Sequence, residues 1–209
     1  LFEARVRDIS GSQVELEVLS CFEAKAPPVV DMALAVTRAP RLDMAVEKCS
    51  EIGVRRIIPF ISSRSIWRGD GRSNERKRDR LVRKAETACK QSGQPFFPEV
   101  SRVISFNSLV GIIPSYAGAY LAHRGGENLE VLPREMGVGG VLGIVGPEGG
   151  LTSEELDSLQ EAKAVLLSLG HFRLRSETAA ICLLFKLRII LSGVQDGGKN
   201  GTSKDGTLR

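Results

Sequence analysis

The stretch Val141–Glu155, VLGIVGPEGGLTSEE, decides the fold of this chain. Its first five residues are apolar or small and predict a buried strand. Gly146–Gly150 holds three glycines in five positions, so the backbone can turn sharply and come close to a ligand. Thr152 and Glu155 have the spacing of a capping box and predict the start of a helix. In open α/β sheets, ligands bind beside loops that follow the carboxyl ends of strands.

The spacing of these glycines limits the kind of ligand. It matches neither the G-x-G-x-x-G pattern of dinucleotide sites nor a P-loop that ends in Gly-Lys-Ser/Thr. A dinucleotide or triphosphate site is therefore not predicted. Taken alone, the stretch is equally consistent with a tight turn before a capped helix.

A second loop of the same kind lies at Leu169–Ala179, LGHFRLRSETA. Arg173 and Arg175 come just before an expected helix start at Ser176 or Glu177, where hydroxyl and acidic side chains suit the free N–H groups. One helix and one strand separate the two loops, so we expect them to converge at one edge of the sheet and form a pocket. The alternative is that both arginines are solvated and Glu177 only caps the helix.

Between residues 29 and 191, short apolar runs alternate with segments of helical periodicity. This alternation predicts an α/β fold with a mostly parallel sheet and helices on both faces. We expect strands at 29–36, 57–61, 116–123, 141–146 and 164–169, and helices at 42–52, 75–92, 152–163 and 177–191. Pro59, within the second run, lacks an N–H group and indicates an edge strand or a strand end.

The two ends of the chain have other patterns. Apolar residues at every second position on both sides of Gly11 predict a β-hairpin over residues 1–24 with one buried face. Two strands cannot form a stable core, so the hairpin should pack against something else. Pro27 and Pro28 suggest a linker. We therefore divide the chain into a β segment at 1–28, an α/β domain at 29–191 and a flexible, Gly- and Ser-rich tail at 192–209.

The composition excludes several classes of protein. The 209 residues are 42% hydrophobic and 26% charged, which is typical of a globular chain and not of a disordered or fibrous one. No apolar stretch reaches the roughly 18 residues that span a bilayer. The cysteines lie far apart and form no C-x-x-C pair, so we expect no metal site and reduced thiols in the cytoplasm. The net charge of +4 permits a polyanionic partner without requiring one.

Positive charge is concentrated at residues 72–84, where seven of thirteen residues are basic. In a helix, Arg76, Arg80, Arg83 and Lys84 share a face that can follow a phosphate backbone. The alternative is an ordinary solvated helix face. Arg64 and Gln91 are further polar candidates for contact with RNA.

At this point the sequence resembles a known family, the RsmE-type ribosomal RNA methyltransferases of the SPOUT class. The blocks GPEGG at 146–150 and LRSETA at 174–179 carry the resemblance. It extends upstream to RLDMAVEKCSEIGV at 41–54 and ACKQSG at 88–93, and spans roughly residues 1–191.

The resemblance implies a trefoil knot at the C-terminal end of the sheet, and a hairpin that is the remaining part of a PUA-like barrel. It implies a homodimer in the cytoplasm, or in an organelle if the source is eukaryotic. It also implies that S-adenosylmethionine binds in a pocket of three loops. The implied cofactor-binding residues are Leu121, His123, Gly146, Pro147, Glu148, Gly149, Gly150, Leu169, Gly170, Leu174, Arg175 and Thr178.

The implied reaction is methyl transfer to N3 of a uridine in small-subunit (16S) ribosomal RNA. Uracil N3 is a poor nucleophile until its proton leaves, and a cation near the uracil carbonyls favours the anion. Arg175 is our candidate for that role, and Glu177 is a second catalytic candidate, as the base. Two alternatives are a SPOUT enzyme that methylates a ribose 2′-oxygen or another base, and a non-catalytic knotted RNA-binding protein.

Overall fold

The computed structural model describes residues 2–24, 28–65, 71–128 and 140–197. The strands are β1 (Phe2–Ser10), β2 (Gln13–Cys21), β3 (Val30–Ala35), β4 (Arg56–Ile61), β5 (Glu99–Val100), β6 (Ile104–Ser105), β7 (Gly118–Glu127), β8 (Val141–Val145) and β9 (Ala164–Leu167). The α-helices are α1 (Ala39–Ile52), α2 (Gly71–Ser92), α3 (Phe106–Ile112), α4 (Ser153–Glu161) and α5 (Ser176–Gly197), and a 3₁₀ turn, η1, covers Ile113–Ser115.

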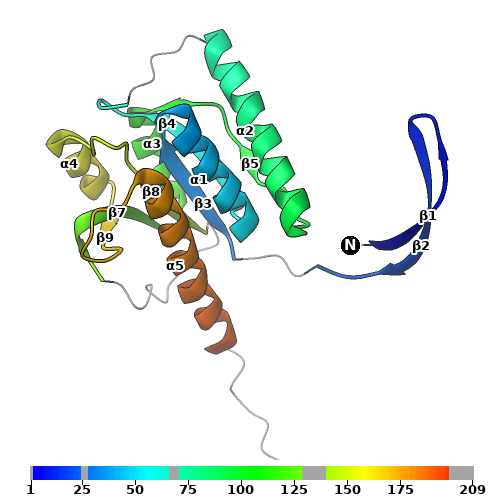
Figure 1. Ribbon diagram of the computed structural model, residues 1–209. Helices are drawn as coiled ribbons and strands as arrows, with labels where there is room; N and C mark the ends of the chain where they lie inside the picture. The colour runs from blue at the N-terminus through cyan, green and yellow to red at the C-terminus, as the bar shows by residue number, and fades with distance from the viewer. Residues whose placement is uncertain (1, 25–27, 66–70, 129–139, 198–209) are drawn as a thin grey trace, which may run out of the picture.

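The main sheet has seven strands and the order β5-β4-β3-β8-β7-β9, with β6 also paired to β4 (Figure 1). All its recorded pairs are parallel, as the alternation of strands and helices predicts. The neighbours β3, β8, β7 and β9 therefore all end at the same edge of the sheet.

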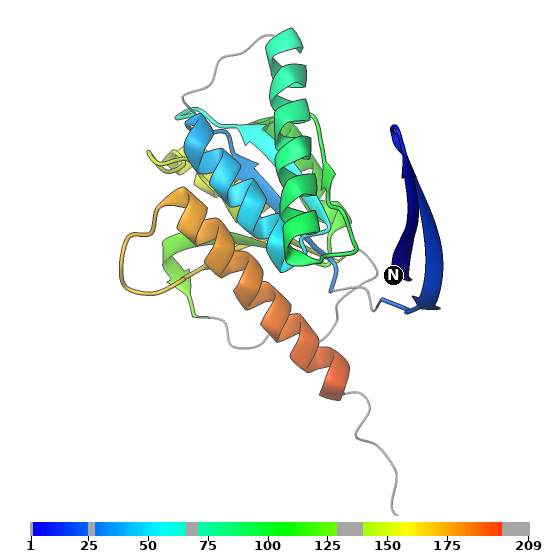
Figure 2. The ribbon, with the colours of Figure 1, turned by 45° about the vertical axis from the view of Figure 1, so that its right-hand side comes forward.

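Helices cover both faces of this sheet, and the alternation of side chains along β3 explains how (Figure 2). Val30, Met32 and Leu34 point to one face, where they pack with α1, α2 and α5. Ala33 and Ala35 point to the other, where they pack with α3 and α4. All six residues of β3 are buried, as expected of a central parallel strand.

Pro59 lies in the interior of the sheet, so the prediction of an edge strand is wrong. Strand β4 pairs with β3 on one side and with β5 and β6 on the other. The two outer strands are only two residues long, and they pair with Arg56–Ile57 and Phe60–Ile61. The proline thus falls at the gap between β5 and β6, where no outer neighbour needs its missing N–H group.

The two ends of the chain depart in part from expectation. The hairpin of β1 and β2 forms as predicted, but it stands beside the α/β body (Figure 1), and its apolar side chains, such as Phe2 and Leu16, are exposed. Its predicted buried face is therefore not buried within this chain. Helix α5 continues to Gly197, beyond the predicted end at Leu191, and residues 198–209 of the predicted tail lie outside the described residues. No described helix is long and apolar enough to span a membrane.

A buried ion pair fixes the start of β3. The Asp31 side chain is fully buried and accepts two 2.7 Å hydrogen bonds from Arg55 and one of 2.6 Å from the hydroxyl of Tyr116. Burial, and then the bond to Asp31, raise the pKa of Tyr116, which keeps the phenol protonated as a donor. The cluster joins β3 to residues 55 and 116, which precede β4 and β7.

We predict that Asp31→Asn destabilises the protein by roughly 2–4 kcal/mol, because it leaves buried donors facing an amide instead of a carboxylate. Denaturant unfolding followed by circular dichroism measures this. The control Glu99→Gln breaks the exposed 3.0 Å pair with Arg56 and should change stability by less than about 0.5 kcal/mol. Equal effects of the two substitutions would contradict the prediction.

Candidate active site

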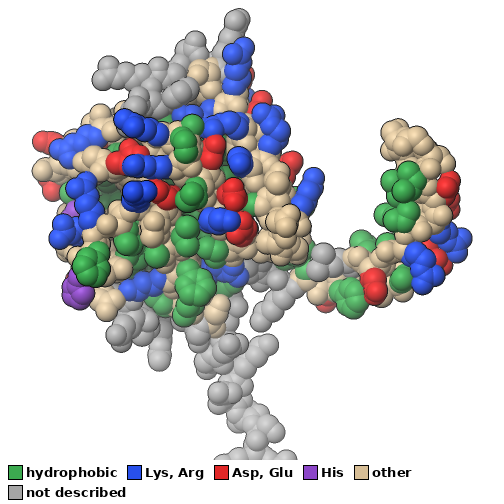
Figure 3. Space-filling view, in the orientation of Figure 1, with side chains coloured by type: hydrophobic (Ala, Val, Ile, Leu, Met, Phe, Trp, Pro, Cys, Tyr) green, Lys and Arg blue, Asp and Glu red, His purple; other side chains and the backbone are tan. Residues whose placement is uncertain are grey.

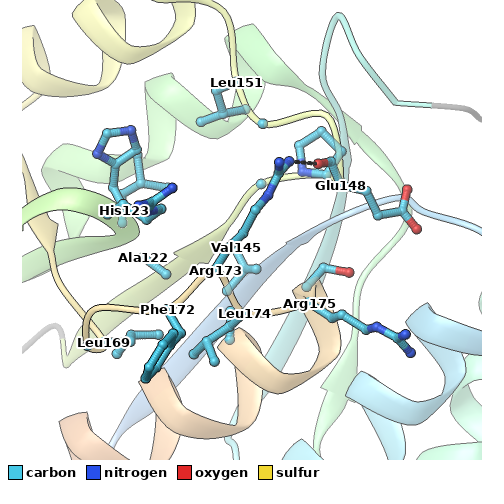
Figure 4. Close-up of a pocket in the computed structure, with 18 of the residues that line it drawn as sticks. Ala122, His123, Val145, Glu148, Leu151, Leu169, Phe172, Arg173, Leu174 and Arg175 are labelled. Atoms are coloured by element: carbon cyan, nitrogen blue, oxygen red, sulfur yellow. Dashed lines mark hydrogen bonds between the residues drawn. The ribbon is translucent and has the colours of Figure 1, made fainter.

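A cavity of about 500 Å³ lies at the carboxyl ends of β7, β8 and β9 (Figure 4). Its walls come from residues 121–124 of β7, from the glycine loop that follows β8, and from the loop between β9 and α5. The volume is in the range of sites for small molecules and cofactors. The structure therefore brings together the two loops that the sequence predicts to converge and residues 121–124, the third segment that the family resemblance implies.

Most of the predicted cofactor-binding residues line this one cavity. They are Leu121, His123, Gly146, Pro147, Glu148, Gly150, Leu169, Gly170, Leu174 and Arg175. Gly149 lies in the glycine loop and Thr178 in the first turn of α5, and neither is among the lining residues. The positive φ angles of Gly150 (+72°) and Gly170 (+123°) explain why each loop needs glycine there.

Arginines hold the glycine loop in place from three parts of the chain. Arg41, in the first turn of α1, donates a 2.6 Å hydrogen bond to the carboxylate of Glu148. Arg173 donates to the backbone carbonyl of the same residue at 2.9 Å, and its side chain reaches across the cavity opening (Figure 4). Arg64 donates to the carbonyl of Gly149 at 2.8 Å. Arg41 and Arg173 also line the cavity, which gives its rim a positive charge.

The sequence did not predict that Arg41 holds the glycine loop. It predicted Arg64 only as a contact for RNA. The bond from Arg41 spans 107 positions and that from Arg64 spans 85. No local pattern reports contacts at such separations. The only available signal for Arg41 is its position at the start of the segment 41–54 that resembles the methyltransferase family.

The capping box after the glycine loop forms as predicted and has a further contact. Thr152 accepts from the N–H of Glu155, and the Glu155 carboxylate accepts from the N–H of Thr152 at 2.9 Å. The other carboxylate oxygen accepts from the N–H of Ser63 at 2.7 Å. Glu155 is only 6% exposed, so one buried carboxylate ties the segment after β4 to the start of α4.

The lining of the cavity combines apolar side chains, glycine backbone and charged side chains. Its apolar side chains, such as Val145 and Leu169, come from strand ends and loops, while glycines expose backbone groups. Arg124, Arg173 and Arg175 add cationic groups, and Glu148 is the one carboxylate among the recorded lining residues. Such a site suits a molecule with an apolar or planar body and charged ends.

The two predicted catalytic residues differ in position. Arg175 is exposed and lines the cavity. Glu177 is 7% exposed, accepts a hydrogen bond from the Ser176 hydroxyl at 3.3 Å, and is not among the lining residues. Its place in the first turn of α5 matches a favourable interaction with the helix dipole.

The predicted RNA-contacting residues of α2 line two cavities, which share Arg80. Arg76 and Arg80 line a cavity near the start of α2. Arg83 and Gln91 line another farther along the helix, together with acidic residues of α1. Arg80 pairs with Asp43 and is thereby tied to α1. The described residues contain no cluster of His, Cys, Asp and Glu that could hold a metal ion.

Comparison with known proteins identifies the class. A family model described as an RNA methyltransferase domain matches residues 24–188, which is most of the chain. The chain therefore belongs to this RNA methyltransferase family.

Particular relatives carry a narrower name. "Ribosomal RNA small subunit methyltransferase E" of Bacillus subtilis is 30% identical over 194 residues, which cover 88% of this chain and 76% of the relative. The protein of that name from Mycobacterium tuberculosis is 28% identical, and the match covers 79% of this chain but only 64% of the relative.

Solved structures agree on the fold. A Legionella pneumophila protein in complex with its bound cofactor S-adenosylmethionine superposes with a TM-score of 0.79 at 27% identity, covering 90% of this chain and 78% of that one. The small-subunit methyltransferase E of Neisseria gonorrhoeae, bound to S-adenosylmethionine, gives a TM-score of 0.80 at 24% identity with the same coverage.

We predict that Glu155→Ala destabilises the protein by about 1–2 kcal/mol, because it removes the N-terminal capping contact and leaves the N–H of Ser63 unpaired. Thermal unfolding measures the loss. The control Glu161→Gln changes an exposed carboxylate in the last turn of the same helix and should be neutral. A neutral Glu155→Ala would show that the buried bond to Ser63 contributes nothing.

Proposed function

We propose that this protein is an S-adenosylmethionine-dependent methyltransferase that modifies N3 of a specific uridine in 16S ribosomal RNA. The observation that carries the proposal is the single cavity of about 500 Å³ enclosed by the ends of three adjacent parallel strands. The family match and the S-adenosylmethionine bound in the Legionella structure support the donor. The names of the relatives support the ribosomal substrate.

The residues of the cavity fit the donor. S-adenosylmethionine combines a planar base with a zwitterionic amino-acid end and supplies an electrophilic methyl group when bound. Gly146, Gly150 and Gly170 would let backbone groups approach the base, and Leu121 and Leu169 would contact its faces. Glu148 would attract the ammonium group and the arginine rim the carboxylate of the donor.

Arg175 is the proposed catalytic residue for the acceptor. Methyl transfer from a sulfonium needs alignment and exclusion of water, and no covalent intermediate. Loss of the N3 proton puts negative charge on the uracil carbonyls, which a guanidinium can stabilise with several N–H donors. Arg175 is exposed at the cavity, whereas Glu177 is buried outside its lining, so the geometry favours the arginine for direct contact.

Two features of the fold belong to the same proposal. The chain would form a trefoil knot at the C-terminal end of the sheet, an exception to the rule that chains do not thread loops. The hairpin at 2–21 would be the remaining part of a PUA-like barrel, which supplies the missing cover for its apolar side chains. The α/β domain would carry the donor site.

We also propose that the active unit is a homodimer that works on ribosomal RNA in the cytoplasm. Helices α1 and α5 pack side by side, and each exposes large apolar side chains. Phe185 and Ile189 lie one turn apart on α5 and are 57% and 56% exposed, and Met44 on α1 is 50% exposed. Hydrophobic side chains are visible over these helices in Figure 3. Such a cluster on a folded domain marks an interface.

We predict that Arg175→Ala lowers the rate of methyl transfer to small-subunit RNA by roughly 100-fold, because it removes a preorganised cation from the developing anion. Nucleoside mass analysis of the product measures the rate and shows which atom is methylated. Calorimetry should find donor affinity largely kept. Arg102→Ala, at an 82% exposed side chain, is the matched control. Unchanged turnover would refute the role of Arg175, and a 2′-O-methyl product would refute the proposed acceptor.

We predict that Phe185→Asp converts a dimer into a monomer, since a charge in an apolar interface is left unpaired. Light scattering after size exclusion measures the mass. Phe97→Asp, at a residue that is 53% exposed outside α1 and α5, should leave the mass unchanged. A wild-type chain that is monomeric at all concentrations would overturn the proposed dimer.

A further inference from the structure

A second cavity, which we call the cationic pocket, lies between the start of α1 and the first turns of α2. Its volume is about 380 Å³. Among the lining residues that the structure describes, four are basic and none carries a carboxylate. The lining residues are Thr37, Arg38, Ala39, Ser73, Arg76, Lys77 and Arg80.

The positive charge of the pocket is only partly neutralised. Arg80 is bonded to Asp43, which lies outside the lining. For Arg38 and Arg76, no carboxylate within the described part of the chain comes into salt-bridge range. Arg38 and Arg76 therefore remain available to a bound anion. A group of like charges in a partly enclosed space stabilises a bound anion.

Lys77 is a buried cation in the lining of the pocket. The side chain is 7% exposed, and burial, with a further contribution from Arg80, lowers its pKa to about 8, while Asp43 acts in the opposite direction. The buried ammonium is therefore held in a region that disfavours positive charge.

The backbone adds to the positive field. Helix α1 begins at the pocket, since Ala39 is both its first residue and part of the lining. Its N-cap, Arg38, makes no side-chain capping bond, and no acidic residue occupies the first turn. Pro40 has no N–H group, and Arg41 donates its N–H to the carbonyl of Arg38 at 3.1 Å. The helix start therefore offers the N–H of Ala39, beside the basic side chains of the pocket.

The cationic pocket lies at the same edge of the sheet as the donor cavity. Thr37 and Arg38 follow the end of β3, and β3 pairs directly with β8, whose end carries the glycine loop. A small cavity lies between the two sites, lined by Thr37 on one side and by Arg41 and Gly146 on the other. Arg38 and Arg41, three positions apart on α1, thus line different but adjacent sites.

We propose that the cationic pocket binds a phosphate group of the RNA substrate, one that lies close to the nucleotide held at the donor cavity. The ligand is a phosphodiester, recognised by three arginines, a buried lysine and the start of α1. This inference rests on the proposed function for the identity of the RNA. A free phosphate ion has the same chemistry, so the test separates the two sources.

The test compares two double variants of the full chain with equal loss of charge. Arg38→Gln with Arg76→Gln removes two exposed side chains of the pocket and spares the buried Lys77. Lys90→Gln with Arg102→Gln removes two exposed charges elsewhere. Binding of a small-subunit ribosomal RNA fragment is measured by anisotropy at several salt concentrations, without donor. The pocket variant should bind about 10-fold more weakly than the control, with a log–log salt slope lower by about one.

Equal RNA affinities and slopes for the two double variants would overturn the proposal. Calorimetry with inorganic phosphate gives the second arm. Saturable phosphate binding that the pocket variant loses, without any change in RNA binding, would show a free-ion site and also overturn it. Failure of the proposed function gives a different result. A wild-type chain that binds RNA with the expected salt slope but transfers no methyl group would support the phosphate site and refute the methyltransferase activity.

Discussion

The parallel pairing of β3, β8, β7 and β9 is the constraint on which the rest of the structure depends. Parallel strands in one sheet all end at the same edge, so the segments that follow them must meet there. Residues 121–124 of β7, the glycine loop after β8 and the loop after β9 enclose the candidate donor cavity. The segment after β3 enters the cationic pocket instead. A different strand order would scatter these four segments and leave neither cavity.

The glycine loop after β8 shows how contacts fix the conformation of a loop at this edge of the sheet. Glycine lowers the cost of positive φ but also makes the unfolded loop more flexible, so contacts must restrict it. Arg41, Arg64 and Arg173 provide them through side-chain and carbonyl oxygens. A guanidinium can donate to protein and still present further N–H groups to a ligand. The same arginines can therefore hold the loop and give the rim its charge.

Local patterns in the sequence predicted the local features of the site. The capping box of Thr152 and Glu155 and the convergence of two glycine-containing loops depend on short spacings and on the alternation of strands and helices. Contacts across long separations, such as that between Arg41 and Glu148, leave no such pattern. The error at Pro59 has another cause. The rule for proline assumes continuous neighbouring strands, and here two short strands leave a gap.

The basic segment 72–84 shows why charge in a sequence does not by itself define a binding surface. In the sequence, its basic residues predict one charged helix face. In the structure, however, α2 packs along α1, and the acidic residues of α1 are unevenly distributed along that contact. Toward the C-terminal end, Lys84 lies 3.9 Å from Glu47, and acidic side chains of α1 line the neighbouring groove. Near Arg76 the facing part of α1 is its uncapped start, which carries Arg38 and no acid. Figure 3 shows both signs of charge over these helices. The opposing helix therefore decides which part of a basic run remains available to a polyanion, and here it is the part nearest the donor cavity.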